Sequence, residues 1–234
     1  MWAIVPIKRF DQAKKRLASV LSAPERKALM LAMARDVLST LSRCQRLSGI
    51  LLVSRAPEAD ALAEAFGLRQ FAESAEANLP EALTEARDHA VAELGARSIF
   101  IVHADAPLID PTETDGIIAA HRGVTLLPDA ERIGTNGMIC TPPDAIPFVF
   151  DGKSFNAHAE HARRAGLGLQ VADGSGLALD IDTPADLLQL LRQGPSSQTG
   201  IYLQKSGIAE RLAAVDNEGF QKQGIRPGSH APRT

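Results

Sequence analysis

The chain alternates short apolar runs with longer amphipathic stretches, and this alternation limits its fold more than any other feature. Apolar runs at residues 2–7, 49–54 and 98–103 are separated by stretches with apolar residues at helical spacing, such as 24–41 and 78–94. Strands that are apolar along their whole length, joined through helices, are typical of mostly parallel sheets. We therefore expect an α/β fold with a mostly parallel sheet and helices on both faces.

Capping signals locate several helix starts. Each signal pairs a residue that can cap a helix with an acidic residue three positions later. The three pairs are Ser22 and Glu25, Asp110 and Glu113, and Thr183 and Asp186. Shorter apolar runs predict further strands at 124–127, 138–140, 169–172 and 177–181.

Composition changes after Gln193. Residues 194–234 are rich in Gly, Ser, Gln and Pro, and only 208–215 have helical spacing. We therefore expect a domain over 1–193 and a partly disordered tail over 194–234. On this interpretation, truncation after Gln193 leaves the core folded.

Bulk properties exclude several classes of protein. The formal net charge of −3 gives no overall basic field for nucleic acid. No apolar run approaches the ~20 residues that span a bilayer, and residues 1–10 do not resemble a signal peptide. The two cysteines, Cys44 and Cys140, lack a paired spacing, so neither a disulfide nor a zinc site is expected. These properties predict a cytoplasmic protein that binds neither nucleic acid nor membrane.

A basic segment follows the first apolar run. Within nine residues it holds five cations: Lys8, Arg9, Lys14, Lys15 and Arg16. At the carboxyl end of a buried strand these side chains suit a triphosphate, because lysine offers a point charge and arginine a bidentate fork. The alternative is a solvated basic loop before a helix.

Asp105 directly follows the apolar run at 98–103 and is held by Pro107. An aspartate at the carboxyl end of a strand is well placed to hold Mg²⁺ beside phosphate groups. The alternative is a turn or helix-capping aspartate. For His103, two residues earlier, a structural role is the preferred interpretation.

Asp180 and Asp182 alternate along the strand expected at 177–181 and its end, so both side chains should face one side. Two such carboxylates repel each other unless a cation or a hydrogen-bond donor lies between them. This pattern favours a metal site. The alternative is that Asp182 only caps the last helix, or that Thr183 does so and Asp182 is exposed.

Two further segments have residues suited to an anion. Thr135 and Asn136 are flanked by glycines, which let a backbone approach a ligand, although Asn136-Gly137 is also a strong hairpin dipeptide. The segment 151–154 opens a helix whose amides, with Lys153 and Ser154, would bind a second anion. The alternative for that segment is an ordinary capped helix, and His158 and His161 in it are expected at the surface.

Several segments form a specific pattern in this order: PIKRFDQAKKRL, LSAPER, HADAPL, IGTN, FDGKSFNAH and GLALDIDTPADL. The pattern resembles the 2-phospholactate guanylyltransferase family of coenzyme F-420 biosynthesis, over residues 1–193. That family includes forms acting on phosphoenolpyruvate or 3-phosphoglycerate. The resemblance implies a single Rossmann-like domain of the nucleotide-diphospho-sugar transferase type. It also implies transfer of GMP from GTP to the phosphate of a small phosphorylated carboxylic acid, with release of pyrophosphate.

The resemblance also implies roles for individual residues. The GTP phosphates would be contacted by Lys8, Lys14 and Arg16. Mg²⁺ would be held by Asp105, Asp180 and Asp182, and the catalytic set would be Lys14, Arg16 and Asp105. The acceptor would be bound by Thr135, Asn136, Asp151, Gly152 and Ser154.

Two residues depart from the family pattern. The family usually has a bulkier residue in place of Ala106, and a glycine in place of Lys153, which would add a cation to the acceptor pocket. Two other interpretations stay open. One is a nucleotidyltransferase of the same fold, such as the molybdenum-cofactor type, although those have a glycine-rich loop after the first strand. The other is a non-catalytic nucleotide-binding module. Exposed apolar helix surface would allow a homodimer.

Overall fold

The computed structural model describes residues 1–7, 10, 14–173 and 176–214, in which seven strands form one sheet. The strands are β1 Trp2–Pro6, β2 Gly49–Val53, β3 Arg69–Phe71, β4 Ile99–Val102, β5 Val124–Pro128, β6 Thr135–Cys140 and β7 Leu169–Val171. Their order is β3-β2-β1-β4-β6-β5-β7. Only β6 runs antiparallel to its neighbours, β4 and β5, so the expected mostly parallel sheet is confirmed.

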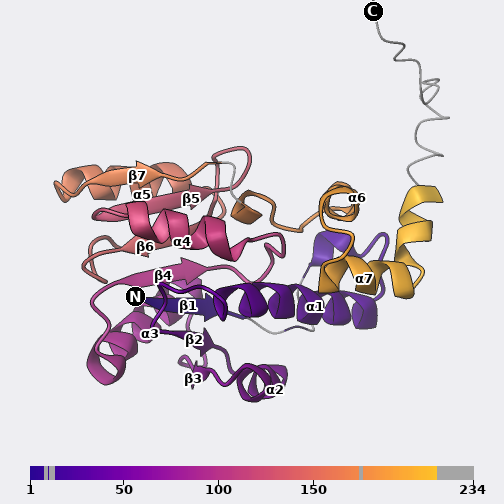
Figure 1. The fold of residues 1–234 in the computed structure, drawn as a ribbon, viewed down its shortest axis with the longest axis horizontal. Helices are drawn as coiled ribbons and strands as arrows, with labels where there is room; N and C mark the ends of the chain where they lie inside the picture. The colour runs from indigo at the N-terminus through magenta and orange to yellow at the C-terminus, as the bar shows by residue number, and fades with distance from the viewer. Residues whose placement is uncertain (8–9, 11–13, 174–175, 215–234) are drawn as a thin grey trace, which may run out of the picture.

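Helices cover both faces of this sheet (Figure 1). They are α1 Ala23–Leu41, α2 Pro57–Phe66, α3 Leu79–Leu94, α4 Pro111–Ala120, α5 Ser154–Arg164, α6 Pro184–Gln193 and α7 Gln198–Lys205. Successive strand residues point to opposite faces. Ala3 and Val5 pack in the cluster that includes α1, whereas Ile4 packs in the cluster that includes α3 and α5. Within the described ranges no helix is long and apolar enough to cross a membrane.

The predicted capping signals define helix starts. The hydroxyl of Ser22 accepts from the backbone N–H of Glu25, and the Glu25 carboxylate accepts from Ser22 in return. Thr183 and Asp186 form the same reciprocal box at α6. Asp110 instead accepts two backbone N–H groups at the start of α4. These caps satisfy N–H groups that have no partner inside the helix.

Three segments meet at one edge of the sheet. The carboxyl ends of β1 and β4 lead into the stretches that hold residues 14–17 and 103–110. Because β6 is antiparallel to β4, its first residue, Thr135, lies at that same edge. The edge therefore brings together side chains from distant parts of the chain.

The strand predicted at 177–181 is absent. Residues 176–178 form a short 3₁₀ helix, and 179–183 are irregular. The backbone N–H of Ile181 donates to the Asp105 carbonyl at 3.0 Å, and Ala178 accepts from Ala130 at 3.2 Å. These two backbone hydrogen bonds join the segment to residues outside the strands, so it does not extend the sheet.

The packed chain extends beyond residue 193, so the predicted domain boundary is too early. Helix α7 and the helical residues 208–214 pack with α1, and Leu203, Ile208 and Leu212 are buried in the same cluster. One of the polar residues that suggested a tail is Ser197, which caps α7. Its hydroxyl accepts a hydrogen bond from the Gly200 N–H. The rest of the predicted tail, 215–234, lies outside the described residues.

Replacing Asp36 with Ala is expected to destabilise the protein by about 1–2 kcal/mol. The Asp36 carboxylate on α1 accepts hydrogen bonds from the backbone N–H groups of Gln198 and Thr199 and from the Thr199 hydroxyl. Urea denaturation measures the loss. In a chain truncated after Gln193, which we now expect to be less stable than the full chain, the same replacement should have no effect. An equal loss in both chains would contradict this docking role.

Candidate active site

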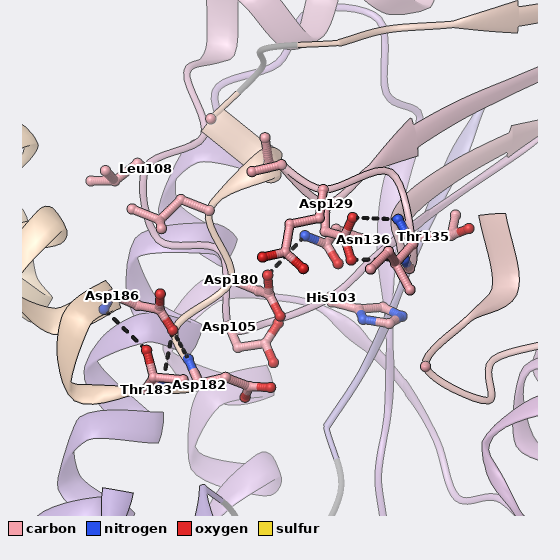
Figure 2. A pocket seen from close by; sticks show the side chains of 18 of the residues that line it. His103, Asp105, Leu108, Asp129, Thr135, Asn136, Asp180, Asp182, Thr183 and Asp186 are labelled. Atoms are coloured by element: carbon pink, nitrogen blue, oxygen red, sulfur yellow. Dashed lines mark hydrogen bonds between the residues drawn. The ribbon is translucent and has the colours of Figure 1, made fainter. Parts of the chain in front are cut away.

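A cavity of about 970 Å³ opens at this edge of the sheet. The segment after β4 contributes His103 and Asp105, and the segment before α6 contributes Asp180 and Asp182. Thr135 and Asn136 line it from the start of β6 (Figure 2). Carboxylates thus line one part of the cavity, and neutral hydrogen-bonding groups line another.

The Lys14 ammonium lies between two of the carboxylates. It donates to Asp105 Oδ2 and to Asp182 Oδ1, at 2.7 Å each. The lysine backbone is in the left-handed region, with φ of 54°, and its side chain is only 6% exposed. Arg16 is more exposed and lies 3.2 Å from Asp182 Oδ2. The pair that holds a cation between its carboxylates is therefore Asp105 and Asp182, and not Asp180 and Asp182, for which the sequence pattern suggested it.

This arrangement changes the proton affinities of the groups in it. Burial by itself lowers the pKa of Lys14, but the two carboxylates outweigh burial and raise that pKa above its ordinary value. Burial likewise acts to raise the pKa of Asp105, and the Lys14 ammonium outweighs it, so that pKa falls below its ordinary value. Both groups are therefore held in their charged forms.

Asp180 has no such partner. Its pKa is raised, because it is buried and because the carboxylates of Asp105 and Asp182 are close. The Asn136 side-chain amide donates to Asp180 Oδ1 at 3.2 Å and to the Leu177 carbonyl at 2.8 Å, which fixes the position of the carboxylate. Asp105 Oδ1 is also buried and has no hydrogen-bond partner in the part of the chain that the structure describes.

The predicted three-carboxylate metal site is not assembled as expected. Among the residues that the structure describes, no group of three or more Asp, Glu, His or Cys side chains has an arrangement that holds a metal ion. Lys14 occupies one oxygen each of Asp105 and Asp182. The oxygens left to meet a cation are those of Asp180 and the unpartnered Asp105 Oδ1.

The predicted acceptor residues are only partly brought together. Thr135 and Ser154 are buried and line the cavity, as does the exposed Gly152. Asp151 does not line it: its carboxylate is exposed and accepts from the Lys153 N–H at 2.9 Å. Lys153 is exposed too and does not line the cavity, so the cation expected in the acceptor pocket is absent there.

The hairpin between β5 and β6 is not closed by Asn136-Gly137, which lies within β6. Its turn is held by Asp129, whose carboxylate accepts from the N–H groups of Ile133 and Gly134 at 2.8 and 2.7 Å. Asp129 also lines the cavity, and the sequence analysis missed it. An aspartate after a strand and shortly before a glycine is the signal that could have identified this turn.

Two histidines, His158 and His103, have surroundings that the sequence analysis did not predict. His158 is fully buried rather than at the surface; it shares a helix face with Ser154, Ala159 and Ala162, and that spacing was the available signal. His103 lines the cavity, and its ring packs 5.2 Å from that of Phe150. Its Nε2 is buried without a partner, and burial lowers its pKa, so the ring is neutral.

The remaining predicted residues have different outcomes. Arg16 lines the cavity with a side chain that is 73% exposed. Lys8, the third predicted nucleotide-binding cation, lies outside the described residues. Asp182 does not cap α6, because Thr183 does, and the Asp182 carboxylate is free to meet Lys14.

Replacing Gly176 with Ala is expected to destabilise the protein by about 2 kcal/mol and to reduce activity. An added Cβ would lie 2.1 Å from the Leu108 carbonyl oxygen, so the segment leading to Asp180 would have to move. Thermal denaturation and turnover measure both effects. Gly116→Ala is the matched control: nothing lies within 4 Å of its added Cβ, and alanine suits the middle of α4. Equal behaviour of the two variants would contradict the packing argument.

The fold and the site together define a nucleotidyltransferase of the nucleotide-diphospho-sugar transferase type. Residues 1–218 match the family model described as "Guanylyl transferase CofC like". The chain belongs to this family, which confirms the resemblance seen in its motifs.

Individual proteins are similar to this chain over most of its length. A phosphoenolpyruvate guanylyltransferase from Conexibacter woesei is 36% identical, over 90% of this chain and 96% of its own length. A 2-phospho-L-lactate guanylyltransferase from Methanothermobacter thermautotrophicus is 33% identical, over 87% of this chain and 89% of its own. A candidate nucleotide-diphospho-sugar transferase from Desulfovibrio desulfuricans shares the fold, with a TM-score of 0.73 at 18% identity, over 90% of this chain and 97% of its own.

Proposed function

We propose that this protein transfers GMP from GTP to the phosphate of a small phosphorylated carboxylic acid and releases pyrophosphate, as a step of coenzyme F-420 biosynthesis. The observation that carries the proposal is a single cavity lined in one part by Asp105 and Asp182, which pair with Lys14, and in another by Thr135 with Ser154. A triphosphate and a small anion can then meet between them. Phosphoenolpyruvate, 2-phospholactate and 3-phosphoglycerate are the candidate acceptors.

Positioning and charge neutralisation supply the catalysis in this proposal. The acceptor phosphate attacks the α-phosphorus of GTP in line, and pyrophosphate leaves. A phosphate oxygen is already ionised at neutral pH, so the reaction needs no general base. Lys14 and Arg16 provide positive charge beside the phosphates, consistent with the nucleotide-binding role proposed for them. Thr135, Gly152 and Ser154 hold the acceptor.

The acidic part of the cavity fits a divalent cation. Asp180 has a raised pKa beside two other carboxylates, and Asp105 Oδ1 is buried without a hydrogen-bond partner among the described residues, so both residues have an oxygen that can meet a cation. We propose that Asp105 and Asp180 hold Mg²⁺, with Asp182 beside them. A bound Mg²⁺ would neutralise phosphate charge. Lys14 holds the pKa of Asp105 below its ordinary value, so this carboxylate is ionised before a cation binds.

Pyrophosphate release tests the proposal. The purified protein is given GTP, Mg²⁺ and each of the three acids separately, with ATP and CTP in place of GTP as controls. We expect release with GTP and one or more of the acids, and none without acid. Folded protein that releases no pyrophosphate with any acid would contradict the proposal and favour a nucleotide-binding module.

Two accompanying proposals concern the protein in the cell. We infer a cytoplasmic enzyme, because GTP and the candidate acids are cytoplasmic metabolites. The proposed homodimer would cover exposed apolar side chains such as Val91 and Ile201. Light scattering of the purified protein tests it, and a monomer at all concentrations would contradict it.

A further inference from the structure

The hydrogen bonds around His158 determine which of its ring nitrogens carries the proton. The backbone N–H of Val149 donates to His158 Nε2 at 2.9 Å. A nitrogen that accepts a hydrogen bond cannot carry a hydrogen toward the donor. His158 Nε2 is therefore unprotonated, and in the neutral ring the hydrogen is on Nδ1.

The neutral state of this ring follows from its surroundings. His158 is fully buried, and burial together with the nearby His161 lowers its pKa to about 4. Its ring packs edge-on against Phe150, with centroids 5.0 Å apart. A second proton would have to replace the hydrogen bond from Val149. At neutral pH His158 is thus an imidazole with one donor and one acceptor.

The single donor of His158 faces Thr135. His158 Nδ1 lies 3.0 Å from Thr135 Oγ1, so the Nδ1–H donates and the hydroxyl oxygen accepts. The hydrogen of the hydroxyl cannot point at Nδ1, because that nitrogen already carries one. Thr135 is buried and lines the cavity, and the structure has no acceptor for this hydrogen among the described residues.

We propose that His158 is a positioning residue that orients the Thr135 hydroxyl as a hydrogen-bond donor toward an anionic oxygen of the acceptor. The proposal deepens the proposed function and rests on it for the identity of the anion. A hydroxyl that is free to rotate can turn its hydrogen in several directions, whereas here the Nδ1–H occupies one lone pair of the oxygen and the hydrogen is left to donate into the cavity. It is therefore preorganised for a phosphate or carboxylate oxygen, which only accepts.

Nuclear magnetic resonance tests the orientation without any assay of activity. The full chain is labelled with ¹⁵N-histidine, and the ring nitrogens of His158 are assigned through their couplings to the carbon-bound ring protons. We expect the less common tautomer, protonated at Nδ1 and not at Nε2, at neutral pH. A ring protonated at Nε2, or at both nitrogens, would overturn the proposal. This holds whether or not the protein transfers GMP.

Kinetics then test the consequence, with the acid that supports turnover. Thr135→Val, which removes the donor but keeps the shape, should raise the acceptor KM about tenfold, and Thr135→Ser should keep it near the original value. His158→Phe should raise the acceptor KM several-fold and leave the GTP KM unchanged. In the Thr135→Val background, His158→Phe should add nothing to the acceptor KM.

His161→Phe is the matched control, one turn along the same helix. His161 is only partly buried, and within the described part of the chain it makes no hydrogen bond to Thr135, so the acceptor KM should not change. A merely structural role for His158 predicts a different pattern: His158→Phe would raise both KM values together, and its effect would add to that of Thr135→Val. That pattern would overturn the proposal.

Discussion

Asp180→Asn is expected to lower turnover on the order of a thousandfold while the folded protein becomes no less stable. The native carboxylate is buried beside Asp105 and Asp182, which raises its pKa. A raised folded-state pKa means that the ionised form destabilises the fold, and that this cost appears as pH rises through that pKa. At neutral pH a neutral amide removes the cost but also removes a proposed ligand of Mg²⁺.

The two measurements separate catalysis from stability. Turnover is followed by pyrophosphate release, and unfolding by heat in metal-free buffer. Asp144→Asn, an exposed position away from the cavity, should change neither. Asp105→Asn and Asp182→Asn should lose turnover as well, but each should also lose stability because each leaves Lys14 with one partner fewer. Full turnover in all three aspartate variants would remove the metal argument.

Lys14→Met is expected to destabilise the protein by about 2–3 kcal/mol at neutral pH and to abolish turnover. The replacement leaves two partly buried carboxylates without the ammonium that compensates them. In the native protein the lowered pKa of Asp105 gives stability that is present above its unfolded-state pKa and lost as pH falls through the folded value. Without Lys14 the carboxylates should have raised pKa values, so acidification should stabilise the variant.

Thermal denaturation at pH 8 and pH 5 tests this reversal. The melting temperature of the Lys14→Met variant should rise on going to pH 5, and that of the native protein should not. Lys27→Met is the matched control, because Lys27 pairs with Glu58 at the surface of α1 and its side chain is 42% exposed. Its loss should stay within about 0.5 kcal/mol at either pH. A melting temperature of Lys14→Met that falls at pH 5, as in acid denaturation of the native chain, would contradict the assigned role of Lys14.

Local signals were sufficient for much of the fold. The capping box of Ser22 and Glu25 located the start of α1 to within one residue, because the hydrogen bonds involved span only three positions. The apolar run at 98–103 correctly predicted β4, which is buried along its whole length. Such features depend on neighbouring residues, and a sequence displays them directly.

The segment at 177–183 shows why other features could not be predicted from the sequence. Its alternating pattern resembles a strand, but the described backbone groups of Ile181 and Ala178 pair with Asp105 and Ala130, which lie outside the strands of the sheet. The three aspartates nevertheless line one cavity. The repulsion argument concerned Asp180 and Asp182, whereas the ammonium lies between Asp105 and Asp182 and comes from Lys14, which is 168 positions away from Asp182. No local pattern contains this information.

Composition misled the prediction at the end of the chain and in α5. Polar residues after Gln193 resembled a tail, although Leu203, Ile208 and Leu212 among them are spaced to pack on α1. His158 was expected at the surface because histidine is polar, but Val149 and Thr135 satisfy both of its nitrogens inside the protein. In both cases tertiary contacts outweigh the preference of the residue type.

The pairing of Lys14 with Asp182 has a consequence for biosynthesis. A ribosome releases residue 14 long before residue 182, and it adds the residues of α7 that cover α1 later still. The nascent chain therefore carries an uncovered apolar face on α1 through most of translation, and the Lys14 ammonium has at most one of its two partners until residue 182 is added. We expect the first 180 residues to recruit chaperones while the chain is being made, and the protein to release them only after its last helices emerge.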